Sequence, residues 1–313
     1  MKILITDGLA KDAVKMLESA GHEIVMDEVT PERLLEVAGD YECIIVRSRS
    51  KVTKAVIEKG SKLKVVARAG IGVDNIDVKA ATEKGIKVVN APLGSTISVA
   101  ELAFGHMLDL SRGITKGTMA LKQGKWLKKE LKGFELEGKT VGIIGCGRIG
   151  QALASRCRAF GMKVKGFDPF LTPEAAKVAG IDLVGLDDML KASDYVSLHV
   201  ALTDSTKKML GAPQFAMMKK SAYLVNCARG GVVDEEALYA ALKEGRLAGA
   251  GLDVFETEPP VNPKLAELDN VTFTPHIGAN TKEAQDKAGV QVAEQVLLCL
   301  SGKDPVFWVN RPK

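Results

Sequence analysis

Two side chains that follow predicted strands, Arg229 and His276, could together bind a small acid and move a proton. Arg229 follows the apolar run 222–225, and its planar guanidinium suits a bidentate hydrogen bond to a carboxylate. His276 follows the run 271–273, and an imidazolium can donate a proton near neutral pH, an effect typically worth ~10²–10⁴-fold in rate. Reduction of a 2-oxo acid needs a hydride on carbon and a proton on oxygen, so this pair predicts hydride chemistry on a small acid.

Alternative roles for these side chains stay open at this point. Glu258, which precedes a pair of prolines, could orient the imidazole of His276 and stabilise its protonated form, or it could be an ordinary loop carboxylate. Arg229 could form a structural salt bridge. Among the four histidines, His199 also ends a predicted strand and competes with His276 as the proton donor. His106 lies inside a helical pattern and is better explained by packing or by an interface.

The segment Gly145-Cys-Gly-Arg-Ile-Gly150 predicts a dinucleotide site. It follows an apolar run and opens a helical pattern, which is the context that a G-x-G-x-x-G motif requires. Gly145 allows the tight turn, Gly147 lets the backbone approach a pyrophosphate, and Gly150 lets the helix pack closely on the strand. Free amides at the helix N-terminus would then face the pyrophosphate. A glycine turn with a purely structural role is the alternative.

Asp168 closes the next predicted strand and predicts which dinucleotide binds. Its carboxylate is placed to accept hydrogen bonds from the ribose hydroxyls, and its charge would repel a 2′-phosphate. We therefore expect NAD rather than NADP. The alternative is a turn residue before Pro169.

Short runs rich in Val and Ile alternate with amphipathic segments, which indicates buried parallel strands connected by helices. Strands are expected at 3–5, 24–26, 43–46, 65–67, 88–89, 141–144, 164–167, 195–198, 222–225, 249–254 and 271–273. Helices are expected at 10–20, 96–112, 148–160, 235–244 and 282–300, with a solvated lysine-rich linker at 122–132. Two such series predict an α/β fold of two doubly wound, parallel-sheet (Rossmann-like) domains.

The composition excludes several classes of function. The 313 residues carry a formal net charge of +4 with both signs interleaved, so no nucleic-acid partner is expected. No apolar window approaches a membrane span, no hydrolase elbow or phosphate-loop motif is present, and no group of residues has metal-ligand spacing. The five cysteines form no C-x-x-C pair, and the first residues lack a secretion signal. We therefore expect a cytoplasmic protein.

Over nearly its whole length the chain resembles the D-isomer-specific 2-hydroxyacid dehydrogenase family. The segments that carry the resemblance are 68–75, 90–92, 145–150, 226–231, 253–260 and 275–278. It implies that Arg229 binds the substrate, that His276 is the acid/base and that Glu258 is its partner carboxylate. Together with the glycine motif, it implies that NAD contacts Gly145, Gly147, Arg148, Ile149, Gly150, Asp168, His199, Cys227 and Asp253.

The resemblance also implies a discontinuous layout. Residues 1–92 and 280–313 would form a substrate-binding domain, residues 93–279 would form the NAD-binding domain, and the reaction would take place in a cleft between them. The helix 96–112 would pair two subunits into a homodimer, which could assemble further into a tetramer.

Within the family, the chain is most similar to members that oxidise D-3-phosphoglycerate in the first step of serine synthesis. The segments behind this likeness are 46–53, 68–75, 124–126 and 226–234. A phosphate needs cations, and Arg47 and Arg68 are the matching candidates, with Gly70 and Asn90 as further substrate-binding residues. A surface ion pair is the alternative for each arginine. Across a dimer, the same phosphate could be reached by Lys125, Lys128 or Lys129.

Two departures and two rivals bear on that interpretation. Ile71 stands where relatives often carry a small hydroxyl residue, so one phosphate contact could be missing. The chain ends at Lys313, where longer relatives carry a serine-sensing domain, so we expect no serine feedback by that route. A glyoxylate or hydroxypyruvate reductase would share every catalytic and cofactor residue. An NAD-sensing scaffold, like co-repressors built on this fold, would show no turnover.

Overall fold

The chain folds into two compact units. The computed structural model describes residues 1–260 and 264–312. Unit 1 comprises Met1–Thr96 and Ala279–Lys313, and unit 2 comprises Ile97–Gly278. The first boundary falls after Thr96 rather than after residue 92, because the long helix that starts there belongs almost wholly to unit 2. The second boundary falls after Gly278 rather than after residue 279.

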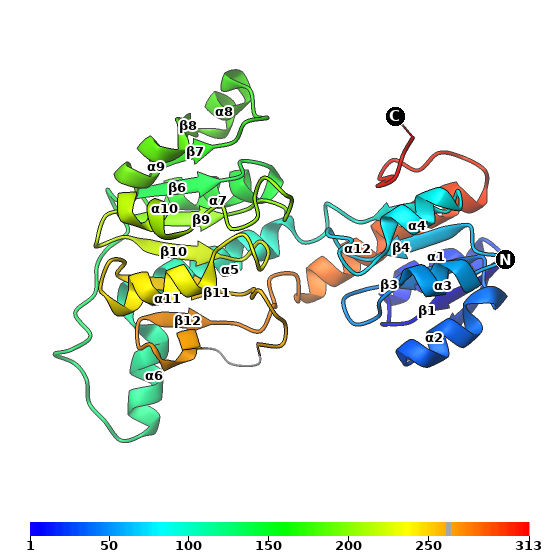
Figure 1. Cartoon of the computed structure of the whole chain (residues 1–313), viewed down its shortest axis with the longest axis horizontal. Helices are drawn as coiled ribbons and strands as arrows, with labels where there is room; N and C mark the ends of the chain where they lie inside the picture. Colours follow the sequence, from blue (N-terminus) through cyan, green and yellow to red (C-terminus); the bar gives the residue numbers. More distant parts are fainter. Residues whose placement is uncertain (261–263, 313) are drawn as a thin grey trace. The chain divides into compact units, whose positions relative to one another are not determined.

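Unit 1 is built on a five-stranded parallel sheet in the order β2-β1-β3-β4-β5 (Figure 1). Its strands are β1 (Lys2–Ile5), β2 (Glu23–Met26), β3 (Cys43–Val46), β4 (Val65–Arg68) and β5 (Lys87–Asn90). Its helices are α1 (Lys11–Ser19), α2 (Pro31–Val37), the 3₁₀ helix η1 (Ala38–Asp40), α3 (Lys54–Lys59), α4 (Val78–Glu83) and α12 (Lys282–Leu300). Apolar clusters fill both faces of this sheet, which explains why its central strand β3 is buried at every position.

The last helix of the chain, α12, completes the core of unit 1. Thr281 starts it by accepting a hydrogen bond from the Ala284 amide at 3.1 Å, which satisfies one of the free donors of the first turn. Val292 and Val296 are fully buried in the same cluster as Ile45 of β3. The C-terminal segment is therefore part of unit 1 although unit 2 separates it from the N-terminal strands in the sequence.

Unit 2 is built on a seven-stranded parallel sheet in the order β12-β11-β10-β9-β6-β7-β8 (Figure 1). Its strands are β6 (Thr140–Ile144), β7 (Lys163–Phe167), β8 (Asp182–Leu183), β9 (Tyr195–Leu198), β10 (Tyr223–Asn226), β11 (Gly249–Leu252) and β12 (Val271–Phe273). Its helices are α5 (Thr96–Arg112), α6 (Ile114–Lys122), α7 (Arg148–Ala159), α8 (Pro173–Ala179), α9 (Leu186–Ala192), α10 (Ala212–Met217), α11 (Glu235–Lys243) and the 3₁₀ helix η2 (Lys264–Glu267). The sheet grows from β6 in both directions, so the order reverses beside that strand.

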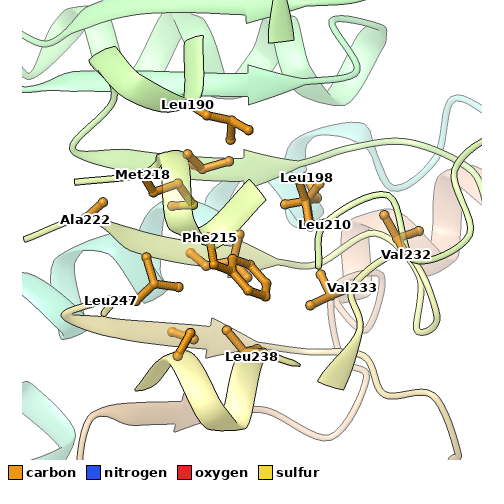
Figure 2. Close-up of a cluster of buried hydrophobic side chains, with 14 of the residues drawn as sticks. Leu190, Leu198, Leu210, Phe215, Met218, Ala222, Val232, Val233, Leu238 and Leu247 are labelled. Atoms are coloured by element: carbon orange, nitrogen blue, oxygen red, sulfur yellow. The ribbon is translucent and has the colours of Figure 1, made fainter. Parts of the chain in front are cut away.

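A large apolar cluster covers one face of this sheet (Figure 2). Phe215 of α10 lies among Leu198 of β9 and Leu238 of α11, and only 1% of its surface is exposed. Truncation of such a phenylalanine to alanine typically costs about 3–5 kcal/mol. The strands that precede the candidate active site are therefore held by a well-packed apolar core.

The α/β class with two parallel-sheet units is confirmed, and every expected strand is present to within two residues at either end. The edge strand β8 was not expected, because two residues are too few to show an alternating pattern. The expected linker begins at the last residue of α6, and Figure 1 shows α6 and the segment after it projecting from the body of unit 2. In the described part of the chain, no helix combines the length and apolarity needed to cross a bilayer.

Candidate active site

The glycine segment lies where the strand order of unit 2 reverses. This segment follows β6. Strand β9 pairs with β6, and His199 is the residue after β9. Gly145 has a φ of +89°, and a Cβ there would lie 2.5 Å from the carbonyl oxygen of His199. Only glycine therefore fits where these two loops meet. Open α/β sheets bind ligands at such a switch point, outside the carboxyl ends of the strands.

The start of α7 is suited to hold a pyrophosphate. Its N-cap is Gly147, which offers no side chain to the first amides, and a Cβ at Gly147 would meet nothing within 4 Å. At Gly150 a Cβ would overlap the carbonyl oxygen of Gly145, so this glycine lets α7 lie against the strand. Arg148 is exposed and Ile149 is half-buried. Uncapped amides at the positive end of the helix dipole are the donors that an anion requires, so these residues fit the phosphates of a dinucleotide.

Asp168 lies against the glycine turn. One of its carboxylate oxygens accepts a hydrogen bond from the Cys146 amide at 2.8 Å, and the other accepts one from the Phe170 amide at 2.8 Å. Burial, reinforced by the charge of Asp168, raises the pKa of the Cys146 thiol to about 12. Cys146 is therefore a neutral packing group at this turn.

His276 and Glu258 form a short hydrogen bond in the site. The Nδ1 atom of His276 lies 2.6 Å from Oε2 of Glu258, and the other oxygen of Glu258 accepts from the Phe255 amide at 3.1 Å. His276 has a φ of +52°, in the left-handed region that a non-glycine residue rarely occupies. Such a conformation persists only where the surroundings hold it, and it is common at functional positions.

Asp253 holds the backbone around His276. It is 1% exposed, and its carboxylate accepts hydrogen bonds from the hydroxyl of Thr274 at 2.6 Å and from the amides of Ile277 and Gly278, each at 2.8 Å. These bonds fix the chain on both sides of His276. Asp253 was expected only as a cofactor contact, and the structure adds this anchoring of the loop.

The loop that carries Arg229 packs against the loop that carries Glu258. A Cβ at Gly230 would overlap the carbonyl oxygen of Phe255, so the two loops can pass this closely only at a glycine. The side chain of Asn226 accepts from the Ala228 amide at 3.0 Å and donates to the carbonyl of Arg229 at 3.1 Å, which shapes the turn. The structure thus brings Arg229, Glu258 and His276 to one edge of unit 2.

The electrostatics of Glu258 reflect this arrangement. Burial opposes its ionisation, but the hydrogen bonds from His276 and the Phe255 amide and the positive charges of His276 and Arg229 outweigh burial. The pKa of Glu258 therefore lies below its usual value, and the group is a carboxylate at neutral pH. A carboxylate beside an imidazole orients the ring and favours its protonated form.

His199 has the opposite character. Its Nε2 lies 2.9 Å from the hydroxyl of Ser197, whereas its Nδ1 is shielded from solvent and has no hydrogen-bond partner in the described part of the chain. Burial lowers the pKa of His199 to about 4. The ring is therefore neutral near pH 7, which favours His276 over His199 as the acid. Cys227 is buried in the turn after β10.

The expected substrate-binding residues of unit 1 lie at the carboxyl edge of its sheet. Arg47 follows β3, and Arg68 and Asn90 are the last residues of β4 and β5 and pair in register. The guanidinium of Arg68 donates to the carbonyls of Arg47 and Gly72, and Asn90 donates to the carbonyl of Ile71 at 2.6 Å. Arg68 therefore also shapes the loop around Gly70, a contribution that the sequence did not reveal.

Three groups that support the site were not expected from the sequence. Asp7 accepts hydrogen bonds from the Arg47 and Ser50 amides and from the Ser50 hydroxyl, and so fixes the loop after β3. Thr274 and His106 are hydrogen-bonded to each other, and Thr274 also donates to Asp253, which anchors the His276 loop. The position of Asp7 after the first strand was the available signal. Nothing in the spacing of His106 or Thr274 indicates their partners.

Comparison with known proteins identifies the family. Residues 104–278 match the model described as "D-isomer specific 2-hydroxyacid dehydrogenase, NAD binding domain". This match agrees with the resemblance noted in the sequence and confirms that unit 2 contains an NAD-binding domain.

Similar proteins span the whole chain. It is 53% identical over 313 residues to D-3-phosphoglycerate dehydrogenase of Methanocaldococcus jannaschii, and it spans only 60% of the length of that relative. It is 48% identical over 299 residues to hydroxypyruvate reductase of Thermotoga maritima, covering 94% of this chain and 97% of the relative. A solved glyoxylate reductase from Paecilomyes thermophila superposes with a TM-score of 0.90 at 31% identity, covering 99% of this chain and 98% of that structure.

The lowered pKa of Glu258 yields a first prediction. Replacing His276→Asn removes the positive charge, so the pKa of Glu258 should rise toward its ordinary value. In the wild type, the depressed pKa means that the carboxylate stabilises the fold above the ordinary carboxyl range, and that this stability is lost as the pH falls through the folded-state pKa. An NMR titration of the Glu258 carboxyl measures the shift, with His199→Asn as the control. An unchanged pKa in His276→Asn would show that the imidazole does not set it.

Proposed function

The chain belongs to the D-isomer-specific 2-hydroxyacid dehydrogenase family, and we propose that it catalyses the NAD-dependent oxidation of D-3-phosphoglycerate to 3-phosphohydroxypyruvate, the first step of L-serine biosynthesis. The observation that carries the proposal is the grouping of Arg229 with the hydrogen-bonded pair of His276 and Glu258 in the NAD-binding unit. The 53% identity to a D-3-phosphoglycerate dehydrogenase supports the choice of substrate.

In this proposal unit 2 holds the cofactor. The amides at the start of α7, between Gly147 and Gly150, bind the pyrophosphate, and Asp168 binds the ribose hydroxyls and disfavours a 2′-phosphate. The loops after β9, β10 and β11 supply the remaining contacts, through His199, Cys227 and Asp253. NAD, held by these residues, would supply the acceptor for the hydride that leaves the substrate carbon.

The side chains of unit 2 bind the substrate acid and handle its proton. Arg229 binds the carboxylate through two parallel N–H donors. His276 takes the proton of the substrate hydroxyl through Nε2 during oxidation and returns it to the carbonyl oxygen during reduction. Glu258, bonded to Nδ1, holds the ring in the tautomer that leaves Nε2 available and stabilises the imidazolium that forms.

The residues of unit 1 would bind the substrate phosphate. Arg47 and Arg68 bring positive charge to the carboxyl edge of its sheet, and Gly70 and Asn90 shape the loops around them. Ile71 supplies only its backbone where a hydroxyl could have helped. Reduction of hydroxypyruvate is the second candidate, favoured by the 48% identity to a hydroxypyruvate reductase of almost the same length.

We further propose a cytoplasmic homodimer that pairs through α5, the helix expected to do so, and we extend the interface to α6 and the segment after it. Apolar side chains that are at least half exposed gather on α6 and the segment after it: Ile114, Met119, Leu121, Trp126 and Phe134. Exposed apolar surface of this extent typically marks an interface. The lysines between them, Lys125, Lys128 and Lys129, are exposed and would reach toward the partner.

Sedimentation velocity tests the dimer. We expect a species of twice the chain mass at micromolar concentration, and Met119→Glu should dissociate it by placing a charge in the apolar face. A monomer at this concentration, or a dimer that withstands Met119→Glu, would contradict the proposed interface.

An assay of NADH oxidation tests the function and the substrate together. We expect 3-phosphohydroxypyruvate to be preferred over hydroxypyruvate, glyoxylate and pyruvate, and NADH over NADPH. Arg47→Ala should lower kcat/KM for the phosphorylated acid about 10- to 100-fold, the value of a lost charged hydrogen bond, and should spare hydroxypyruvate. Arg68→Ala should act in the same direction with some loss of stability, because Arg68 also holds its loop.

Arg33→Ala is the matched control for these arginine variants. Arg33 is an exposed arginine of α2 that pairs with Glu36 at 3.1 Å, so its loss should leave kcat/KM unchanged for every substrate. Preference for hydroxypyruvate that Arg47→Ala does not alter would favour the second candidate. Absence of turnover with all four acids would overturn the proposal of an enzyme.

A further inference from the structure

A chain of four polar groups runs beneath the loop that carries His276. His106 of α5 is 4% exposed, and its Nδ1 lies 2.9 Å from the hydroxyl of Thr272 in β12. Its Nε2 lies 3.1 Å from the hydroxyl of Thr274, which in turn donates to the buried carboxylate of Asp253 at 2.6 Å. Both ring nitrogens of His106 therefore have partners. The series of hydrogen bonds ends at the Asp253 carboxylate, which anchors the loop.

The direction of each hydrogen bond follows from the chemistry of these groups. The Asp253 carboxylate accepts from two backbone amides and can only accept from Thr274 as well. The single hydroxyl proton of Thr274 is thereby used, so this oxygen must accept from Nε2–H of His106. The Nδ1 atom of a neutral ring is then an acceptor for the Thr272 hydroxyl. One tautomer of His106, with the proton on Nε2, satisfies all three bonds.

The fold makes space for this imidazole in its neutral form. A Cβ at Gly251 of β11 would lie 2.7 Å from the Cβ of His106 and 3.0 Å from its Nδ1, so the ring occupies the place of a missing side chain. Burial lowers the pKa of His106, although the charges of Asp253 and Asp109 oppose that shift. A neutral ring has one donor and one acceptor, which is what the two threonines require.

The hydrogen bonds of this polar group hold residues both before and after His276 in the sequence. Thr274 lies two residues before it, and the amides of Ile277 and Gly278 follow it, with all three groups bonded to Asp253. The left-handed backbone of His276 needs such support. Without His106, the hydroxyl oxygen of Thr274 would lose the hydrogen bond from Nε2 and would be freer to turn away from Asp253.

We propose that His106 is a positioning residue for the acid/base His276, acting through Thr274 and Asp253 to hold the 274–278 loop. This inference rests on the proposed function insofar as it concerns the reaction. It assigns to His106 a role beyond packing or an interface, which were the roles expected from its helical pattern.

Kinetics of His106 variants test the proposal. His106→Leu should lower kcat about tenfold, because a small displacement of the acid from its reactive geometry is costly, with KM and the NADH dissociation constant changed less than about twofold. His106→Gln, whose amide offers one donor and one acceptor, should recover most of kcat. If His106→Leu fails to fold, Thr272→Val carries the test, since it removes only the hydroxyl that donates to Nδ1 and should also lower kcat.

Ser111→Ala is the matched control. Ser111 is buried on the same helix and bonds to the hydroxyl of Tyr195 at 2.7 Å, so its loss removes a buried hydrogen bond outside the polar chain. It should lower Tm but leave kcat unchanged. Wild-type kcat in His106→Leu, or in Thr272→Val where it replaces that variant, would overturn the proposal. A loss of kcat that His106→Gln does not restore would also overturn it.

NMR of the histidine rings keeps this test separate from the function. In the wild type, ¹⁵N shifts should report His106 as neutral with the proton on Nε2, and the signals of His276 should move in His106→Leu. If the wild type reduces none of the 2-oxo acids, the proposed function fails, yet these shifts still report whether His106 positions His276. The Nδ1–H tautomer, or His276 signals that do not respond, would contradict the inference.

Discussion

The hydrogen bond between His276 and Glu258 is the contact on which the site depends. Its length of 2.6 Å requires two loops, one after β11 and one after β12, to be held close together. Asp253 fixes the first loop to the second through three hydrogen bonds, and Gly230 lets the Arg229 loop pass against Phe255. None of these groups needs to touch a substrate. They stabilise one arrangement of the loops in the folded protein, so that the imidazole is already oriented by Glu258 before any reaction.

A parallel sheet explains why residues distant in the sequence meet here. Every strand of unit 2 runs the same way, so the loops that follow β6, β9, β10, β11 and β12 all emerge at one edge. The glycine turn at Gly145 and the loop that carries His276 are thus on the same side of a single sheet, whose faces are filled by apolar side chains. Packed strands are a suitable support for a site that binds an anionic cofactor, because the loops that follow them start from ordered backbone.

Much of this could be predicted from residue patterns. Runs of Val and Ile that are buried on both faces gave the strands, and the glycine spacing gave the turn after β6, because both patterns are local consequences of backbone geometry. The compact units divide after Thr96, where α5 starts, and no change of composition marks that point in the sequence. The anchoring bonds of Asp253 and Asp7, the second task of Arg68 and the ring orientation of His106 could not be predicted. Each depends on side chains that are distant in the sequence and meet only in the folded protein. Local residue patterns do not reveal such pairs.

The proposed reaction depends on the proton that His276 is assigned to move. The most direct measurement is kcat for reduction of the best 2-oxo acid by His276→Asn, with NADH affinity measured alongside by fluorescence. We expect a loss of about 10²–10⁴-fold in kcat, the usual contribution of a general acid, with NADH binding retained. A variant that turns over at nearly the wild-type rate would contradict it, because the imidazole held by Glu258 would then have no part in the chemistry.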